Sequence, residues 1–309
     1  MKKLLALLVI ALLTVVACNT SEEPTDSDTP PDTDTEQPSD EEPEDDTDRE
    51  PDDDSEADDD YQAVSYETIF PVVTHVFDEN DEMMFIQMET SPEGLEPHDA
   101  LMMSLQMSDQ TTSEAFSQLQ MVEIEESEAT LHFDGPQPFV SLASAEHMML
   151  DQMFYQLGAF YNIDTFTFIV DGEAGIDYGQ VGFIETLPVE DMAVTGVIQV
   201  TDEALLEGYT PPVYRPIREM VPLQLESFEE TLNKTATFEA PDGFKQIFNG
   251  ISVTDVNESG TQVTIRVTGE TEDDRVVMEA LAIMATEFDF DTLTVINESM
   301  MTRTNVTLY

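Results

Sequence analysis

Two stretches of the chain repeat each other, and this duplication constrains the fold more than any other feature. Residues 161–170 read YNIDTFTFIV and residues 288–296 read FDFDTLTVI, so apolar, Asp and Thr positions coincide at an offset of 127 residues. Upstream, residues 129–135 (ATLHFDG) match residues 263–269 (VTIRVTG) at an offset of 134 residues. The larger upstream offset predicts a longer connection in the first copy. We therefore expect two copies of one unit, over residues 61–190 and 191–309.

The residue patterns predict the same succession of strands and helices in each copy. Alternating apolar residues indicate half-buried strands, and apolar residues three or four apart indicate helices. In the first copy we expect strands at 72–77, 83–88, 121–125, 129–133 and 165–170, and helices at 98–107 and 145–160. In the second copy we expect strands at 198–200, 213–217, 251–256, 262–267 and 292–296, and helices at 223–233 and 274–287. The expected fold class is α/β (α+β), with two tandem small mixed-sheet domains and helices packed on one face.

The start of the chain has the pattern of a bacterial lipoprotein signal. Lys2 and Lys3 precede an apolar run from Leu4 to Val16, and Ala17 stands before Cys18. A charged start, a short apolar core and a small residue before the cut describe a secretory signal peptide. The run is too short to span a bilayer comfortably. We expect residues 1–17 to be removed, Cys18 to be lipidated, and the protein to be anchored at the extracytoplasmic face of the cell membrane. The alternative is a plain signal peptide with an incidental cysteine.

The next segment has a composition typical of a disordered linker. Residues 19–60 hold 22 Asp or Glu, one basic residue (Arg49), and no aromatic or branched aliphatic residue. Such a segment buries too little apolar area to offset its ordering entropy. With Cys18 it forms an expected linker over residues 18–60, whose flexible span is roughly 35 Å. We interpret it as a solvated spacer that lifts the folded part off the membrane.

The folded part is strongly acidic as well. Of 67 acidic residues in the chain, 45 remain outside the linker, against seven of the ten basic residues, and no Lys or Arg occurs between residues 61 and 214. Nucleic acids and anionic lipid headgroups both require clustered cations, so the composition argues against either as a partner. Because salt screens such self-repulsion, the charge points to a salt-rich or alkaline environment.

The order of elements resembles that of the GerMN domain, a family found in sporulation and spore germination lipoproteins. The resemblance rests on two hairpins and two helices, on a closing strand that ends in Val170-Asp171-Gly172, and on Arg215-Pro216-Ile217-Arg218 after Pro212-Val213. It covers most of residues 72–298. The first copy lacks the arginines, and the second ends in Asn297-Glu298 where Asp-Gly is expected. The resemblance implies tandem domains with a protein-binding, non-enzymatic role.

The sequence shows little sign of catalytic or metal chemistry. The four histidines, His75, His98, His132 and His147, have no metal-ligand spacing, and the chain has no second cysteine. We interpret them as structural. The acidic turn that starts at Asp78 has Met83 where a calcium loop requires glycine, which leaves at most a loosely held cation. Glycines 172, 175, 179 and 182 lack a phosphate-loop spacing and are expected in turns. We therefore expect no catalytic residues, no metal and no cofactor.

Three classes of function remain in view. The leading hypothesis is a membrane-anchored scaffold that binds an envelope protein or a second copy of itself, in sporulation or spore germination. The second is a solute-binding lipoprotein of a transport system, which would need a large cleft between the copies. The third, an envelope hydrolase, has only the abundance of carboxylates in its favour. The candidate protein-contact residues are Arg215 and Arg218, whose alternative role is to pair with local carboxylates such as Glu219.

Overall fold

The computed structural model describes residues 61–65, 69–77, 82–90, 95–136, 138–189, 194–218, 227–271, 273–288 and 290–308. The expected signal peptide, the lipidated Cys18, the linker at 18–60 and the turn at 78–81 lie outside these residues. So do Glu219 and the first part of the helix expected at 223–233. Among the described residues, no helix is long and apolar enough to cross a membrane.

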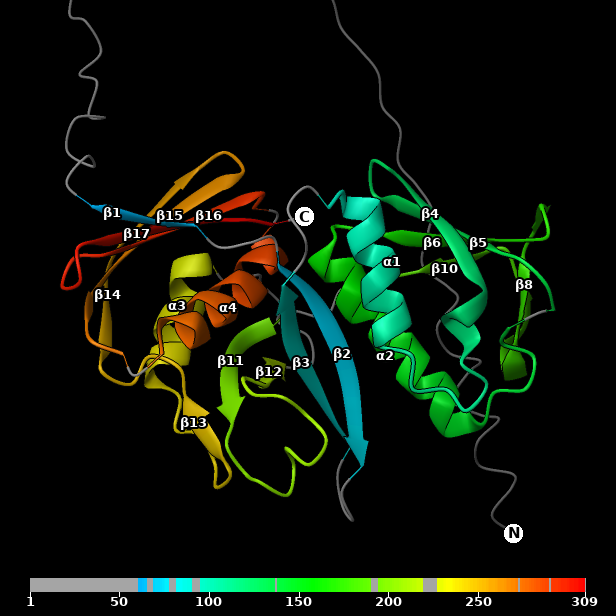
Figure 1. Cartoon of the computed structure of the whole chain (residues 1–309), viewed down its shortest axis with the longest axis horizontal. Coiled ribbons are helices and arrows are strands. Elements are labelled where there is room, and N and C mark those ends of the chain that lie inside the picture. Colours follow the sequence, from blue (N-terminus) through cyan, green and yellow to red (C-terminus); the bar gives the residue numbers. More distant parts are fainter. Residues whose placement is uncertain are drawn as a thin grey trace, which may run out of the picture. The chain divides into compact units, whose positions relative to one another are not determined.

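Each copy of the repeat builds one outer sheet from a hairpin, a helix and two further strands (Figure 1). In the first copy, strands β4 (Leu119–Glu125), β5 (Glu128–Phe133), β6 (Thr165–Val170) and β10 (Thr186–Pro188) lie in the order β10-β6-β5-β4. In the second, β14 (Ile251–Ser259), β15 (Gln262–Gly269), β16 (Thr292–Asn297) and β17 (Thr302–Thr307) lie in the order β17-β16-β15-β14. The two central strands are parallel in both sheets and the outer pairs are antiparallel. This confirms the predicted fold class.

The register of the two sheets agrees residue by residue with the repeats found in the sequence. The equivalent parallel pairs are Ala129–Phe166 and Leu131–Phe168 in the first copy, and Val263–Leu293 and Ile265–Val295 in the second. The bulge in the hairpin recurs as well, between Leu119 and Met121 and between Val253 and Asp255. Two offsets derived from sequence alone thus predict one strand register. Phe166, Phe168, Leu293 and Val295 all lie in the core.

Each parallel pair is joined by a crossover helix, α2 (Ser144–Phe160) in the first copy and α4 (Asp274–Ala285) in the second. Helix α2 packs on β6 through Phe154, whose ring centre lies 4.8 Å from that of Phe166 and 5.9 Å from that of Phe168. Helix α4 contacts β16 of its sheet in the same way. A parallel pair needs such a crossover because a tight turn can join only antiparallel strands.

A central sheet belongs to both copies. Each copy opens with a hairpin, β2 (Ile69–Phe77) with β3 (Glu82–Thr90), and β11 (Val194–Val200) with β12 (Tyr214–Arg218). These hairpins join through β3 and β12 into one sheet of order β13-β11-β12-β3-β2, where β13 is Phe244–Gln246. The order of the hairpin strands is therefore mirrored about the β12–β3 junction, which pairs Tyr214 with Ile86.

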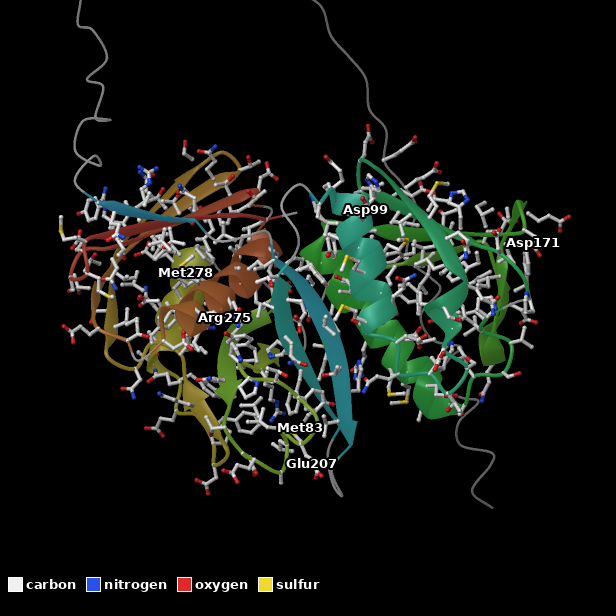
Figure 2. The ribbon with its side chains drawn as sticks, in the orientation of Figure 1. Met83, Asp99, Asp171, Glu207, Arg275 and Met278 are labelled. Atoms are coloured by element: carbon white, nitrogen blue, oxygen red, sulfur yellow. The ribbon has the colours of Figure 1, made fainter. Side chains whose placement is uncertain are left out.

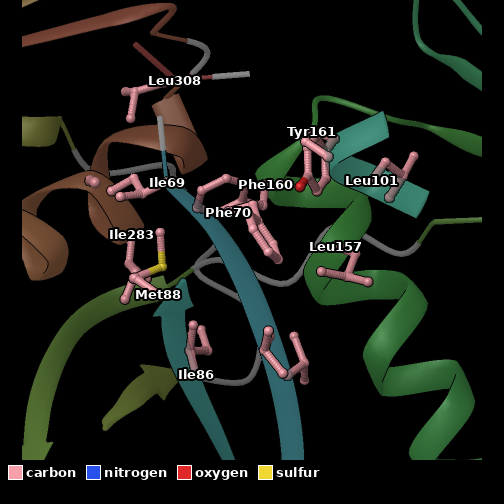
Figure 3. Packing of buried hydrophobic residues seen from close by; sticks show 14 of the residues in the cluster. Ile69, Phe70, Ile86, Met88, Leu101, Leu157, Phe160, Tyr161, Ile283 and Leu308 are labelled. Carbon is pink, nitrogen blue, oxygen red and sulfur yellow. The ribbon is translucent and has the colours of Figure 1, made fainter. Parts of the chain in front are cut away.

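The helices lie between the central sheet and the outer sheets. Helix α1 (Pro97–Met107) contacts β2 and β4, and α3 (Phe228–Thr237) contacts β11. Helix α4 contacts both β11 and β16, and α2 also contacts β2. Buried residues of both copies form one continuous hydrophobic cluster, in which Ile69, Phe70 and Met88 of the central sheet lie between α4 and α2 (Figure 3).

Three elements differ from the sequence prediction. Helix α3 runs from Phe228 to Thr237 because Ser227 and Glu230 form a capping box: the Glu230 amide donates to Ser227 Oγ, and the Ser227 amide donates to the Glu230 carboxylate. Strand β17 closes the second sheet without having been predicted. Strand β1 (Gln62–Ser65), which precedes the first copy in the chain, pairs in parallel with β17 of the second.

The remaining short elements follow β6 and complete the first copy. They are β7 (Glu173–Ala174), β8 (Ile176–Tyr178), β9 (Gly182–Ile184) and the 3₁₀ turns η2 (Ala115–Gln118) and η3 (Gly179–Val181), with η4 (Thr286–Phe288) in the second copy. All four glycines of the stretch from residue 172 to 182 have positive φ, between 52° and 93° to 97°. The prediction that these glycines serve turns is therefore confirmed.

Candidate functional site

Arg215, a predicted contact residue, lies against an aromatic ring. Its guanidinium carbon is 5.3 Å from the centre of the Phe244 ring, within the range of a cation–π contact. Its side chain is half-buried, and its backbone pairs with Ile198 of β11. Arg218 ends β12 and pairs with Val194, and its side chain is outside the described residues. The pairing of these arginines with Glu219 stays a prediction.

The ring of Phe244 belongs to a small second core on the hairpins. Met83, Phe85, Val200 and Val213 are its buried members, and Val76, Leu205, Leu206, Tyr209 and Phe244 pack around them. The segment between β11 and β12 supplies Tyr209, whose ring meets that of Phe85 edge-on at 6.4 Å. Met83 and Glu207 mark this region in Figure 2. Arg215 thus borders an apolar cluster that the two hairpins build together.

A buried polar network links the two copies where β12 meets β3. The Tyr214 hydroxyl of β12 donates to Glu279 Oε2 at 2.8 Å. The Arg275 guanidinium donates through Nε to Glu279 Oε1 and through a terminal nitrogen to the Met88 carbonyl at 3.2 Å. Arg275 and Glu279 lie one turn apart on α4, while Met88 belongs to the first copy. Figure 2 shows Arg275 on α4.

The environment of this network governs its ionisation. The Glu279 side chain is 1% exposed, and burial raises its pKa above the ordinary value of 4.5, while the hydrogen bonds from Arg275 and Tyr214 oppose that shift. Burial also raises the pKa of Tyr214, followed by the nearby Glu279 charge. Both groups keep hydrogen-bond partners, as buried polar groups must. The arrangement joins the copies and places no group at a surface where it could act on a substrate.

The histidines are placed as structural residues. His132 Nε2 lies 2.9 Å from Glu123 on the neighbouring strand. His147 Nδ1 lies 3.4 Å from Asp151 one helical turn away, and its ring centre lies 4.6 Å from that of Tyr178. The backbone of His75 exchanges hydrogen bonds with the Gln110 side chain, which protects the outer edge of β2. In the described part of the chain, no group of three or more His, Cys, Asp or Glu is arranged to hold a metal ion.

One polar pocket of about 320 Å³ lies within the second copy. Its lining comes from β13, the loop before α4 and the first turns of α4: Gln199, Lys245, Gln246, Ile247, Asn249, Glu270, Thr271, Asp273, Val276 and Val277. The volume is near the lower end for small-molecule sites, roughly 300–1,000 Å³. The pocket mixes one cation with carboxylates and amides, and it does not lie between the copies.

Neither the network nor the pocket was predicted from the sequence. Arg275 and Glu279 stand four residues apart on a predicted helix, which is the spacing of an ion pair. That signal predicts a surface pair and not a buried one, because Tyr214 and the Met88 carbonyl come from strands distant in the chain.

Comparisons with known proteins give one point of reference. No protein-family model matches the chain, and no curated protein matches it. Among solved structures, the chain is similar to the tandem GerMN domains of the sporulation protein GerM from Bacillus subtilis, at 12% identity and a TM-score of 0.42. The match covers 78% of this chain and 97% of that one. It names the same domain type that the sequence resembles; the fold itself rests on the strand order and register given above.

Proposed function

We propose that the protein is a membrane-anchored, extracytoplasmic lipoprotein that acts as a non-enzymatic interaction scaffold. The observation that carries the proposal is the filled junction between the copies. Ile69, Phe70, Met88, Phe160 and Ile283 belong to one buried cluster that runs across it. A solute receptor places its ligand at such a junction, whereas here packed side chains join two equivalent repeats into one body that offers its outer surfaces to partners.

The sequence supports the anchoring and the setting of this role. The signal pattern before Cys18 supports lipid attachment, and the acidic linker supports display at a distance from the membrane. The resemblance to GerMN domains supports a role in sporulation or spore germination. The partner would be an envelope protein or a second copy of the chain, with Arg215 and Arg218 in the contact surface.

The first test separates anchoring from secretion. In cells that express the full chain, Cys18→Ser is expected to move the protein from the detergent phase of a phase partition into the medium or to leave it unprocessed, because the acyl chains supply the membrane affinity. The neighbouring Thr20→Ser variant serves as the matched control. Equal membrane retention of Cys18→Ser and Thr20→Ser would contradict the anchor.

The second arm of the same experiment tests the contact surface. The double variant Arg215→Ala with Arg218→Ala is compared with Lys234→Ala with Arg266→Ala, which removes the same charge elsewhere in the second copy. Loss of the Phe244 contact is expected to cost about 0.5–1 kcal/mol. Capture of an untagged copy by a tagged copy, at matched salt, should weaken only for the first pair. Undiminished capture assigns the arginines to local packing and removes them from the proposal.

A solute-binding lipoprotein is the second candidate, and the pocket of about 320 Å³ is the observation that favours it. Its polar lining would suit a small zwitterionic or polyhydroxylated solute. A thermal-shift screen of amino acids and sugars against the full chain tests this candidate, with Lys245→Ala as the pocket variant. A concentration-dependent stabilisation that Lys245→Ala abolishes would favour the receptor over the scaffold.

A further inference from the structure

An apolar pocket lies beneath the strand that enters the fold first. It has a volume of about 100 Å³ and lies between the second outer sheet and α4. Its lining residues are Val64 of β1, Ile251, Val267, Val295, Asn297, Thr302 and Thr304 of the sheet, and Thr271, Asp274, Val277 and Met278 at and before α4. Figure 1 shows β1 at the edge of this sheet, and Figure 2 shows Met278 on α4. The pocket is therefore open at a sheet edge.

Strand β1 occupies that edge with a short ladder. Its four residues pair in parallel with Thr302 to Asn305 of β17, and the Gln62 amide donates to the Met301 carbonyl at 2.8 Å. Gln62 and Ala63 are exposed, and Val64, which lies over the pocket opposite Thr304, is still 37% exposed. The strand satisfies backbone groups of β17, yet its side chains leave the pocket underneath unfilled.

The repeat itself does not require β1. Strand β10 of the first copy is the counterpart of β17: Thr186 faces Thr167 as Asn305 faces Thr294, and the Val189 and Leu308 amides donate to Asp164 and Asp291 in turn. Among the described residues, no strand pairs with the outer edge of β10. The parallel strand beside β17 is thus an addition to one copy and not part of the duplicated unit.

We propose that the β17 edge and the pocket beneath it form a binding site for an extended segment of a partner protein, and that β1 is its intramolecular placeholder. The ligand is a strand that runs parallel to β17 and carries a large aliphatic side chain at the place of Val64. This inference rests on the proposed interaction function and specifies one of its surfaces.

The physical basis is strand addition at an exposed sheet edge. Backbone hydrogen bonds supply affinity, and pockets for alternate side chains supply specificity. The register of β1 shows which backbone groups of β17 are available, and the unfilled volume selects a side chain larger than valine. One additional buried methylene is expected to tighten binding roughly fourfold. An external strand competes with β1, whose short connection to β2 gives it an effective concentration on the order of millimolar.

The test uses the full chain in detergent and three labelled peptides. Their sequence is that of residues 61–65 (YQAVS), with valine retained or changed to Leu or Asp at the fourth position. The chain carries Val64→Asp, which weakens docking of its own strand. By fluorescence anisotropy, the Leu peptide should bind about fourfold tighter than the Val peptide, and the Asp peptide at least tenfold more weakly than the Val peptide. A Val64→Leu chain should bind all three peptides more weakly than the Val64→Asp chain, because its own strand fills the pocket.

Disulfide trapping locates the bound strand. Ala63 faces Arg303, so a peptide with Cys in place of Ala63 should form a disulfide with an Arg303→Cys chain and not with a Phe183→Cys chain, whose cysteine lies on the exposed β8–β9 hairpin. Equal binding of the three peptides, absence of binding to the Val64→Asp chain, or equal trapping at both cysteines would overturn the proposal. Loss of peptide binding with intact capture between copies would leave the scaffold function in place and remove only this site.

Discussion

At the scale of single residues, Glu279 is the carboxylate whose environment departs most from water. Burial raises its pKa above 4.5, the ordinary value. The folded state therefore binds more protons than the unfolded state above that value, so this group lowers the free energy of unfolding as pH rises from about 4.5 towards the folded pKa. Its stabilising contribution is complete below about pH 4.5 and declines above it.

Glu279→Gln is expected to remove this dependence, because the amide oxygen still accepts from Tyr214 or Arg275 but does not titrate. Relative to the wild type, the variant should become progressively more stable between about pH 5 and about pH 8, measured by urea unfolding at fixed salt. The control is Glu258→Gln, an exposed carboxylate on β14. A stability difference that stays constant across this pH range would show that Glu279 does not titrate in it.

At the scale of elements, β6 illustrates how one strand divides its residues between core and surroundings. Phe168 is fully buried and contacts the rings of Phe139, Phe154 and Tyr178. Phe168→Ala should cost about 3–5 kcal/mol of unfolding free energy, through lost transfer energy and the cavity left behind. Phe183 of β9 is 65% exposed and belongs to the same copy, so Phe183→Ala should cost less than about 1 kcal/mol. Equal losses in urea titrations would contradict the placement of Phe168.

The same scale shows what the sequence can predict. The hairpins and crossover helices were predictable because their apolar residues have clear periodicities. Strand β17 was missed because its sequence TRTNVT holds a single apolar residue, Val306, and its other side chains are polar. The start of α3 was misplaced because the apolar residues at 221 and 223 extend the pattern before the cap at Ser227. The Arg275–Glu279–Tyr214 network depends on packing between strands distant in the chain, which no local pattern encodes.

At the scale of the whole molecule, the copies share structure that each would lose alone. The central sheet joins β3 to β12, and one hydrophobic cluster contains residues of both copies. Arg275 of the second copy donates to the Met88 carbonyl of the first at 3.2 Å. Separation of the copies would expose apolar side chains and leave buried polar groups without partners, which is costly. The duplicated sequence therefore has a structure in which the copies are energetically coupled.

This coupling predicts a single cooperative unfolding transition for both copies. The chain contains no Trp, so a Trp placed at a surface position reports on one copy alone. Phe183→Trp reports on the first copy and Phe238→Trp, at a position 37% exposed, on the second. In urea, the two fluorescence transitions should share one midpoint and one slope and coincide with the circular dichroism signal. Two separate midpoints would show that the shared sheet and core are too weak to couple the copies, and that each unfolds as an independent domain.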